Sequence, residues 1–212
     1  MTFDAKSSCH DSGVMTSTRE LTRDLTIVPL TPERLDDLAE LFAEPGDPRW
    51  CWCASYRVRR AIGRVPPSEN RAVLTEATER GPAPGLIAYR DDRAIGWVSL
   101  GPRENYPRLA YEKVLRPVDD RPVWSIVCFV IARRERGRGL ARVLLEAAIE
   151  HARANGATTL EAYPVDTGGA HIPPPQAYKG TLAMFQRAGF VEVARRRANA
   201  KVIPRPIVRL EL

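Results

Sequence analysis

Residues 133–141 have the residue types and spacing best suited to binding a ligand. They read Arg-Arg-Glu-Arg-Gly-Arg-Gly-Leu-Ala and lead into a strongly amphipathic stretch. Glycine at 137 and 139 lets the backbone approach a ligand closely. N–H groups left unpaired in a first helical turn attract phosphate, and Arg136 and Arg138 add positive charge. We therefore expect this loop to hold a pyrophosphate; the alternative is an ordinary tight turn between a strand and a helix.

Two common classes of nucleotide site are not encoded around this loop. The sequence lacks the Gly-x-Gly-x-x-Gly signature of dinucleotide binding, and it lacks the lysine of a phosphate-binding P-loop. These absences argue against hydride transfer and against nucleotide hydrolysis.

The cysteines offer a second group of candidate residues. Cys51 and Cys53 form a Cys-x-Cys pair, but one such pair and three histidines without ligand spacing are poor grounds for zinc, so we expect no metal. Cys128 is interpreted as a small buried side chain, the alternative being a thiol that accepts an acyl group. The aromatic residues around the Cys-x-Cys pair are interpreted as a substrate wall, with core packing as the alternative: Trp50, Trp52 and Tyr56.

Hydrophobic periodicity predicts the elements that position these residues. Strands are expected at residues 25–30, 85–89, 94–100, 123–131, 158–163, 190–194 and 207–212. Helices are expected from Thr31-Pro32, from a cap at Ser68, from Gly139 to Asn155-Gly156, and over residues 181–188. Residues 90–93 would form a four-residue hairpin loop, and residues 123–131 are apolar enough for a central strand buried on both faces.

Two motifs in this frame resemble those of the GCN5-related N-acetyltransferase (GNAT) superfamily. Residues 136–141 resemble its Arg/Gln-x-x-Gly-x-Gly/Ala signature, and residues 184–190 resemble its short helix ending in Gly-Phe. The order of predicted elements also matches from about residue 23 to residue 212. The resemblance implies an α/β fold: a mixed, mostly antiparallel sheet of six to seven strands with a central splayed parallel pair, and about four helices on its two faces.

The resemblance also implies transfer of an acyl group from acyl-CoA, in the first place acetyl-CoA, to a primary amine of a small molecule or peptide within a ternary complex. The end of the central strand would contact the pantetheine arm and the loop would bind the pyrophosphate. The residues implied are Phe129, Val130, Ile131, Arg136, Gly137, Arg138, Gly139, Leu140 and Ala141.

The sequence departs from the family at the positions that move protons. Many members carry a tyrosine where this chain has Phe185, and phenylalanine cannot donate a proton. Tyr178 is the expected substitute, with aromatic packing as the alternative. The central strand has no carboxylate to serve as base. The remaining candidates for proton transfer are Ser125, Glu112 and Asp166.

Charge and composition bound the remaining possibilities. The net charge of +6 and the arginine-rich segments 57–64, 133–142 and 195–209 allow a polyanionic partner, so an aminoacyl-tRNA as donor or acceptor is an alternative. Surface arginines without a partner would explain the same charge. A non-catalytic acyl-CoA-binding module is a further alternative, prompted by the missing tyrosine and glutamate.

The chain is expected to form one acyltransferase domain over residues 23–212 after a disordered tail at residues 1–22. No apolar run approaches the roughly 20 residues needed to cross a bilayer. Four cysteines do not suggest a disulfide framework. We therefore expect a cytoplasmic protein without a membrane partner, as a monomer or homodimer.

Overall fold

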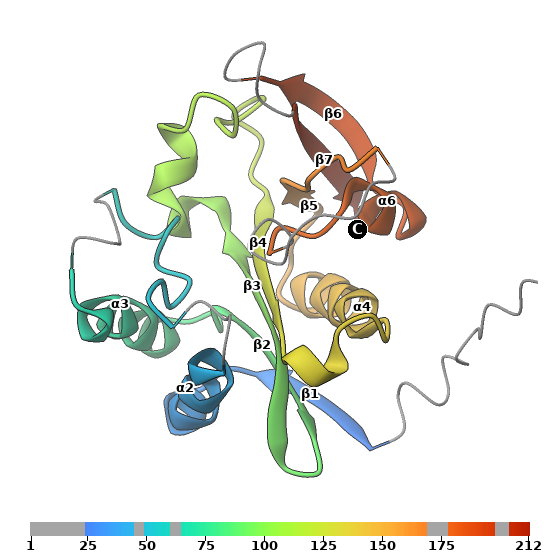
Figure 1. Cartoon of the computed structure of the whole chain (residues 1–212). Helices are drawn as coiled ribbons and strands as arrows, with labels where there is room; N and C mark the ends of the chain where they lie inside the picture. Colours follow the sequence, from blue (N-terminus) through green and yellow to red (C-terminus); the bar gives the residue numbers. More distant parts are fainter. Residues whose placement is uncertain (1–23, 45–48, 60–64, 169–177, 198–203) are drawn as a thin grey trace, which may run out of the picture.

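The apolar runs of the sequence assemble into one seven-stranded sheet with the order β1-β2-β3-β4-β5-β7-β6 (Figure 1). The computed structural model describes residues 24–44, 49–59, 65–168, 178–197 and 204–212, so the expected tail and most of the loop before Tyr178 lie outside the described residues. The strands are β1 Leu25–Pro29, β2 Gly85–Arg90, β3 Arg93–Pro102, β4 Trp124–Ile131, β5 Thr159–Ala162, β6 Val191–Arg196 and β7 Arg205–Glu211. Among the seven strands of the described residues, β4 and β5 alone pair in parallel, which confirms the expected mixed sheet.

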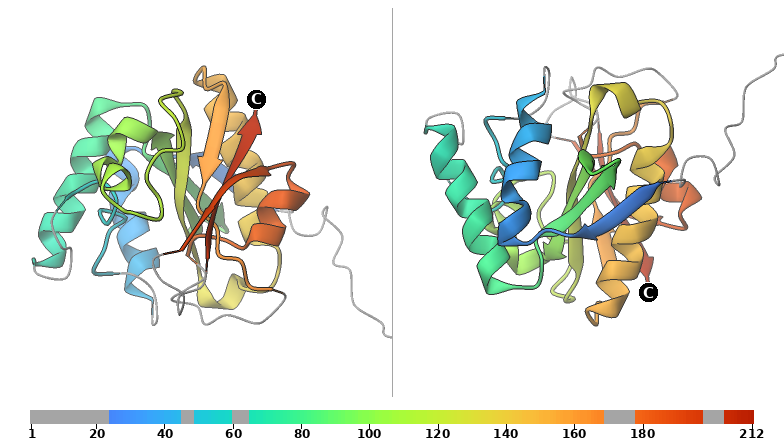
Figure 2. Two further views of the ribbon diagram at one scale, coloured as in Figure 1. Left: turned by 90° about the horizontal axis from the view of Figure 1, so that it is seen from above. Right: turned by 90° about the horizontal axis from the view of Figure 1, so that it is seen from below.

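Helices cover both faces of the sheet, as expected. They are α2 Leu35–Ala43, α3 Pro67–Arg80, α4 Leu140–Ala154 and α6 Leu182–Arg187 within the described residues. In Figure 2, α2 and α3 lie on one side of the sheet and α4 and α6 on the other. The amphipathic helix α4 buries one stripe of apolar side chains and ends at Ala154, followed by its C-cap Asn155 and by Gly156 with a φ of +78°.

A β-bulge in β4 separates it from β5. Ser99 of β3 pairs with Cys128 and Leu100 pairs with Ile126, so Val127 has no partner opposite it. The parallel pairing of β4 with β5 ends at Ile126 and Ala162, directly before the bulge. Because a bulge bends its strand and increases the local twist, residues 128–131 lie along an edge that β5 does not cover. This is the splayed parallel pair that the resemblance implied.

Two local predictions are wrong in detail. The hairpin between β2 and β3 has two turn residues, Asp91 and Asp92, instead of four; their φ values of +49° and +58° match the twist of the flanking strands. The N-cap of α3 is Pro66 and not Ser68, because the helix already starts at Pro67, whose ring presets a helical φ.

The structure also bears on membrane contact. Within the described residues, every helix is too short or too polar to serve as a membrane span.

Candidate functional site

The arginine and glycine loop connects β4 to α4 and presents unpaired backbone N–H groups. Gly137 and Gly139 have φ values of +76° and +87°, and Gly139 is the N-cap of α4. Among the described residues, no acceptor is found for the N–H groups of residues 137–141. A methyl group placed on Gly137 would meet no protein atom within 4 Å. The loop therefore offers an open face of amide donors at the positive end of a 15-residue helix.

Two carboxylates fix this loop against the rest of the sheet. Glu135 is buried and accepts a hydrogen bond from Arg90 of β2 at 2.9 Å. Glu44, directly after α2, accepts a hydrogen bond from the backbone N–H of Arg133 at 3.2 Å. The amide donors are consequently held in place before any ligand arrives, which lowers the entropic cost of binding.

The edge of β4 beyond the bulge carries the residues that the sequence analysis expects to contact pantetheine, Phe129, Val130 and Ile131. The backbone N–H and C=O groups of successive residues alternate in direction along a strand, and the N–H of Ala132 bonds to Ile95 of β3. The backbone groups of Val130 therefore face β3, whereas those of residues 129 and 131 face away from it. Phe129 donates its N–H to the carbonyl of Tyr178 at 2.6 Å. The carbonyl of Ile131 accepts from Nε of Arg136 at 2.9 Å. Two of the predicted edge groups thus have partners within the chain.

Tyr178 begins a segment that connects the uncovered edge of β4 with the chain after β5. Beyond its contact with Phe129, this segment reaches the chain after β5, where Gly180 accepts from the N–H of Val165 at 3.0 Å. Phe185, at the position of the family tyrosine, is fully buried with its ring centroid 6.1 Å from that of Phe129. The phenylalanine belongs to the core, whereas Tyr178 contacts the splayed edge through its backbone carbonyl.

Lys179 brings together two residues that the sequence predicted separately, Tyr56 and Glu112. Its ammonium lies 5.3 Å from the centre of the Tyr56 ring. Burial, followed by the charge of Arg205, lowers the pKa of Lys179 to about 8, and Glu112 acts in the opposite direction. Burial raises the pKa of Tyr56, so its hydroxyl stays protonated. Glu112 itself accepts a hydrogen bond from Nε of Arg108 at 3.3 Å.

The three described cysteines contact one another in a series, from Cys51 through Cys53 to Cys128. Cys53 accepts a hydrogen bond from the indole of Trp97 at 3.1 Å and contacts Cys128. The hydrogen bond with Cys128 raises the pKa of the Cys53 thiol, and that with Cys53 raises the pKa of Cys51. Protonated thiols are poor nucleophiles and poor metal ligands. In the described part of the chain, no three His, Cys, Asp or Glu side chains are arranged to hold a metal.

Ser125 lies before the bulge and joins a buried polar network. Its hydroxyl is 3.1 Å from that of Tyr163, which donates to Glu161 at 2.6 Å. A hydroxyl has one proton to donate, so Ser125 donates to Tyr163. Glu161 is fully buried and accepts from Nε of Arg209 at 2.8 Å. Ser125 could reach a substrate only through such partners, because its own side chain is fully buried.

The aromatic residues of the predicted substrate wall separate into different environments. Trp52 packs in the core, its ring 5.3 Å from that of Phe42. Trp50 is 58% exposed and its carbonyl accepts from Asn70 at 2.7 Å. Tyr56 alone of the three contacts Lys179, so the structure associates only Tyr56 with the splayed edge of β4.

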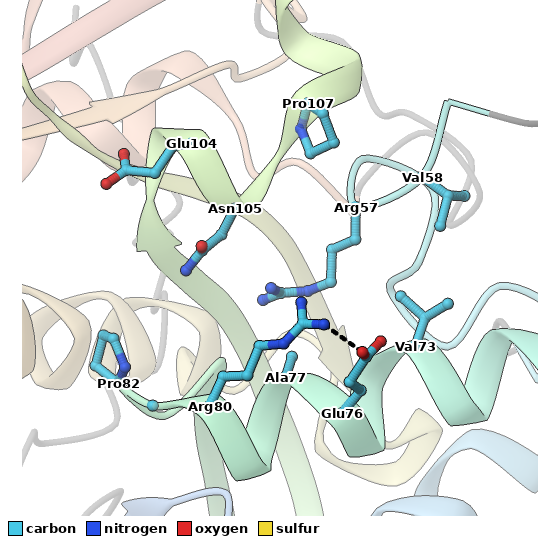
Figure 3. A pocket seen from close by; sticks show the side chains of 11 residues that line it. Arg57, Val58, Val73, Glu76, Ala77, Arg80, Pro82, Glu104, Asn105 and Pro107 are labelled. Carbon is cyan, nitrogen blue, oxygen red and sulfur yellow. Dashed lines mark hydrogen bonds and ion pairs between the residues drawn. The ribbon is translucent and has the colours of Figure 1, made fainter.

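A cavity of about 300 Å³ lies between α3, the segment of Arg57 and Val58, and the chain after β3 (Figure 3). Arg57 and Arg80 reach into it, and Arg80 pairs with Glu76. Arg57 packs over the ring of Tyr106 at 4.6 Å and donates to its hydroxyl at 3.0 Å. Arg57 therefore fixes the segment that carries Tyr56, and the cavity is lined by charges of both signs.

The arginines near the C-terminus have partners within the protein. Arg195 pairs with Asp166 and with Glu192, each at 2.6 Å. Arg196 donates to the carbonyls of residues 116 and 117. Arg209 is 7% exposed and lies in the buried network. These contacts account for three of the six cationic residues in the basic stretch 195–209 that suggested tRNA, and they also engage Asp166, one of the candidate bases.

Sequence reasoning missed Lys179 and Glu161. Glu161 interrupts an apolar strand next to the central one, which is a readable signal for a buried charge. Lys179 follows Tyr178 directly in the sequence. Its contact with Tyr56, however, joins two residues that are far apart in the chain. No local pattern encodes that contact.

The chain resembles acetyltransferases in both sequence and fold. Residues 35–171 match the acetyltransferase (GNAT) family. No curated protein sequence matches the chain.

Solved acetyltransferases share the fold at low sequence identity. A Drosophila melanogaster polyamine N-acetyltransferase that forms N-acetylagmatine is 13% identical, with a TM-score of 0.55 over 89% of this chain and 100% of that one. A GCN5-related N-acetyltransferase from Kribbella flavida is 15% identical, with a TM-score of 0.55 over 90% and 99%. The yncA protein of Salmonella typhimurium, solved with its cofactor acetyl-CoA, is 14% identical, with a TM-score of 0.52 over 89% and 94%. At identities this low, the similarity shows the fold alone.

Proposed function

The chain belongs to the acetyltransferase (GNAT) family, and we propose that it transfers an acetyl group from acetyl-CoA to a primary amine by direct attack in a ternary complex. The observation that supports this most is the loop of residues 137–141, whose open amide donors lie at the N-terminus of α4 beside the uncovered edge of β4. Pyrophosphate and an extended pantetheine arm require those two features side by side.

The residues present fit the donor that the family uses. The open space over Gly137 leaves room for a pyrophosphate at the amide donors. The edge at Phe129 and Ile131 would bind the pantetheine, exchanging the hydrogen bonds now made with Tyr178 and Arg136. When bound, acetyl-CoA supplies the activated acetyl group.

The chain's own side chains would manage the protons. Tyr178 is our candidate for the acid that protonates the leaving thiolate, since its backbone already contacts the splayed edge. Glu112 is our candidate for accepting the proton of the amine, directly or through water, because it lies beside Lys179 and Tyr56. Ser125 would act only as a buried relay.

Binding and transfer can be tested on the full chain. We expect acetyl-CoA to raise the thermal unfolding temperature, and an amine panel to yield free CoA thiol and acetylated product by mass spectrometry. Tyr178→Phe should lower kcat at least roughly tenfold with little change in the dissociation constant of acetyl-CoA. No stabilisation by acetyl-CoA at saturating concentration would contradict the proposal.

The same experiment separates the alternatives. Stabilisation by acetyl-CoA without thiol release from any amine would indicate the non-catalytic acyl-CoA-binding module. An aminoacyl-tRNA as donor or acceptor remains a prediction from the basic segments, and we favour a small amine because Arg195, Arg196 and Arg209 already have internal partners.

A further inference from the structure

Three cationic side chains from separate parts of the chain gather beside the splayed edge of β4. Lys179 follows Tyr178, whose carbonyl accepts the N–H of Phe129 at 2.6 Å. Arg108 donates its backbone N–H to the carbonyl of Tyr56 at 3.1 Å, and Arg205, the first residue of β7, adds positive charge that acts on Lys179. The Tyr56 ring packs against the Lys179 ammonium, and the charges of the same two arginines act on the pKa of its hydroxyl.

Positive charge exceeds negative charge in this cluster. Glu112 is the one carboxylate that acts on Lys179, and it is bound to Arg108 at 3.3 Å. Within the described ranges, no carboxylate lies at ion-pair distance from Lys179 or from Arg205. Two cationic groups next to the proposed acetyl-transfer site therefore have no anionic partner among the described residues.

This charge arrangement has two consequences for an acceptor. Nearby positive charge disfavours the ammonium form of an amine, which makes the neutral, nucleophilic form more available. It also repels an acceptor with a second cationic group, as in a polyamine, and attracts one with a carboxylate. A single molecule that carries both an amine and a carboxylate satisfies both conditions.

We propose that the acceptor is an amino acid or a similar amino carboxylate whose carboxylate binds Lys179 while its amine faces the edge of β4. The inference rests on the proposed acetyl transfer and specifies its substrate class. Tyr56 would contact the body of the acceptor, since its ring lies against Lys179.

Paired compounds that differ only in the carboxylate test the inference. Arginine and agmatine, lysine and cadaverine, and tyrosine and tyramine form three such pairs. We would measure kcat/KM for acetyl transfer, and the added thermal stabilisation by each compound in the presence of CoA. A charge-assisted contact predicts that the carboxylate member of at least one pair is favoured at least roughly tenfold.

Variants of Lys179 identify the residue responsible. Lys179→Gln should raise the KM for the favoured amino acid roughly tenfold while leaving the KM for acetyl-CoA unchanged, because the amides of residues 137–141 lie in a different part of the site. Lys179→Arg, which keeps the charge, should restore most of the loss. Lys113→Gln removes the same charge from an exposed position and should behave as wild type.

The outcomes distinguish this inference from the proposed function. Equal responses to both members of every pair, including no response to any of them, overturn the amino carboxylate while stabilisation by acetyl-CoA upholds the donor site. Loss of acetyl-CoA binding in the wild-type protein overturns the proposed function instead.

Discussion

The pKa of Lys179 is set by its burial and by the charged groups around it. Burial and the charge of Arg205 lower its pKa to about 8, so near neutral pH it still carries a charge that it can lose in mild alkali. The other groups that act on it are Glu112, Cys128, Arg108 and the ring of Tyr56. A charge so poised makes substrate preference dependent on pH.

We expect the preference for a carboxylate acceptor to weaken as the pH rises through about 8. Below that value Lys179 is protonated and attracts the carboxylate, whereas above it the neutral amine does not. The measurement is the ratio of kcat/KM for an amino acid to that for its decarboxylated partner, at pH values on both sides of the transition. The same ratio is measured for Lys179→Gln, because the amines of the two acceptors ionise at different pH values and change the ratio by themselves. The same decline in Lys179→Gln would assign the effect to another group.

Residues whose role depends on local pattern were predictable, and those whose role depends on tertiary contact were not. Gly137 and Gly139 stand out because few residue types adopt a positive φ before a helix. Tyr56 and Glu112 were selected separately on their chemistry, and only the fold brings them to Lys179. Trp52 has the same aromatic character as Tyr56 but packs in the core.

At the level of elements, the bulge in β4 creates the site. It ends the pairing with β5 at Ile126 and uncovers residues 128–131. In the sequence, this strand is apolar apart from Ser125, and no glycine or polar residue stands at Val127 to mark the bulge. The strand itself could be predicted from its residues, whereas the splay followed only from the family resemblance, because a bulge is defined by its partner strand.

The loop that follows β4 provides a matched pair of glycine substitutions. Gly137→Ala and Gly156→Ala lie at opposite ends of α4, at φ values of +76° and +78°, each with open space where the methyl group would go. Both should lose about 1–2 kcal/mol of stability, since alanine disfavours this region. Only Gly137→Ala would place its methyl group against the proposed pyrophosphate site, so it alone should weaken acetyl-CoA binding, by at least roughly tenfold.

Calorimetric titration with acetyl-CoA and thermal unfolding of both variants check this. Equal affinities of the two variants for acetyl-CoA would show that the loop does not contact the pyrophosphate. Unequal losses of unfolding temperature would show that the two sites are not matched, and the affinities would then be compared at a temperature where both proteins are fully folded.

At the level of the whole molecule, the C-terminal hairpin of β6 and β7 is tied to the sheet through buried charge. Arg209 of β7 crosses to Glu161 of β5 and also binds Asp119 through two hydrogen bonds, at 2.7 and 2.8 Å. The position of β7 between β5 and β6 could not be read from periodicity, which identifies strands but not their neighbours. The alternation of charged and apolar residues in β7 marks Arg209 only as a polar position.

Removing Arg209 should destabilise the protein far more than removing an exposed arginine that pairs with the same strand, β7. Arg209→Met leaves Glu161 fully buried with only Tyr163 and the more distant Arg103 as partners, at 2.6 and 3.7 Å. Breaking such a pair costs about 3 kcal/mol. Arg121→Met is the control, because the Arg121 and Glu211 side chains are 51% and 65% exposed, and such pairs contribute less than about 1 kcal/mol. Urea unfolding followed by circular dichroism measures both losses, and similar midpoints for the two variants would mean that the buried network does not hold the hairpin in place.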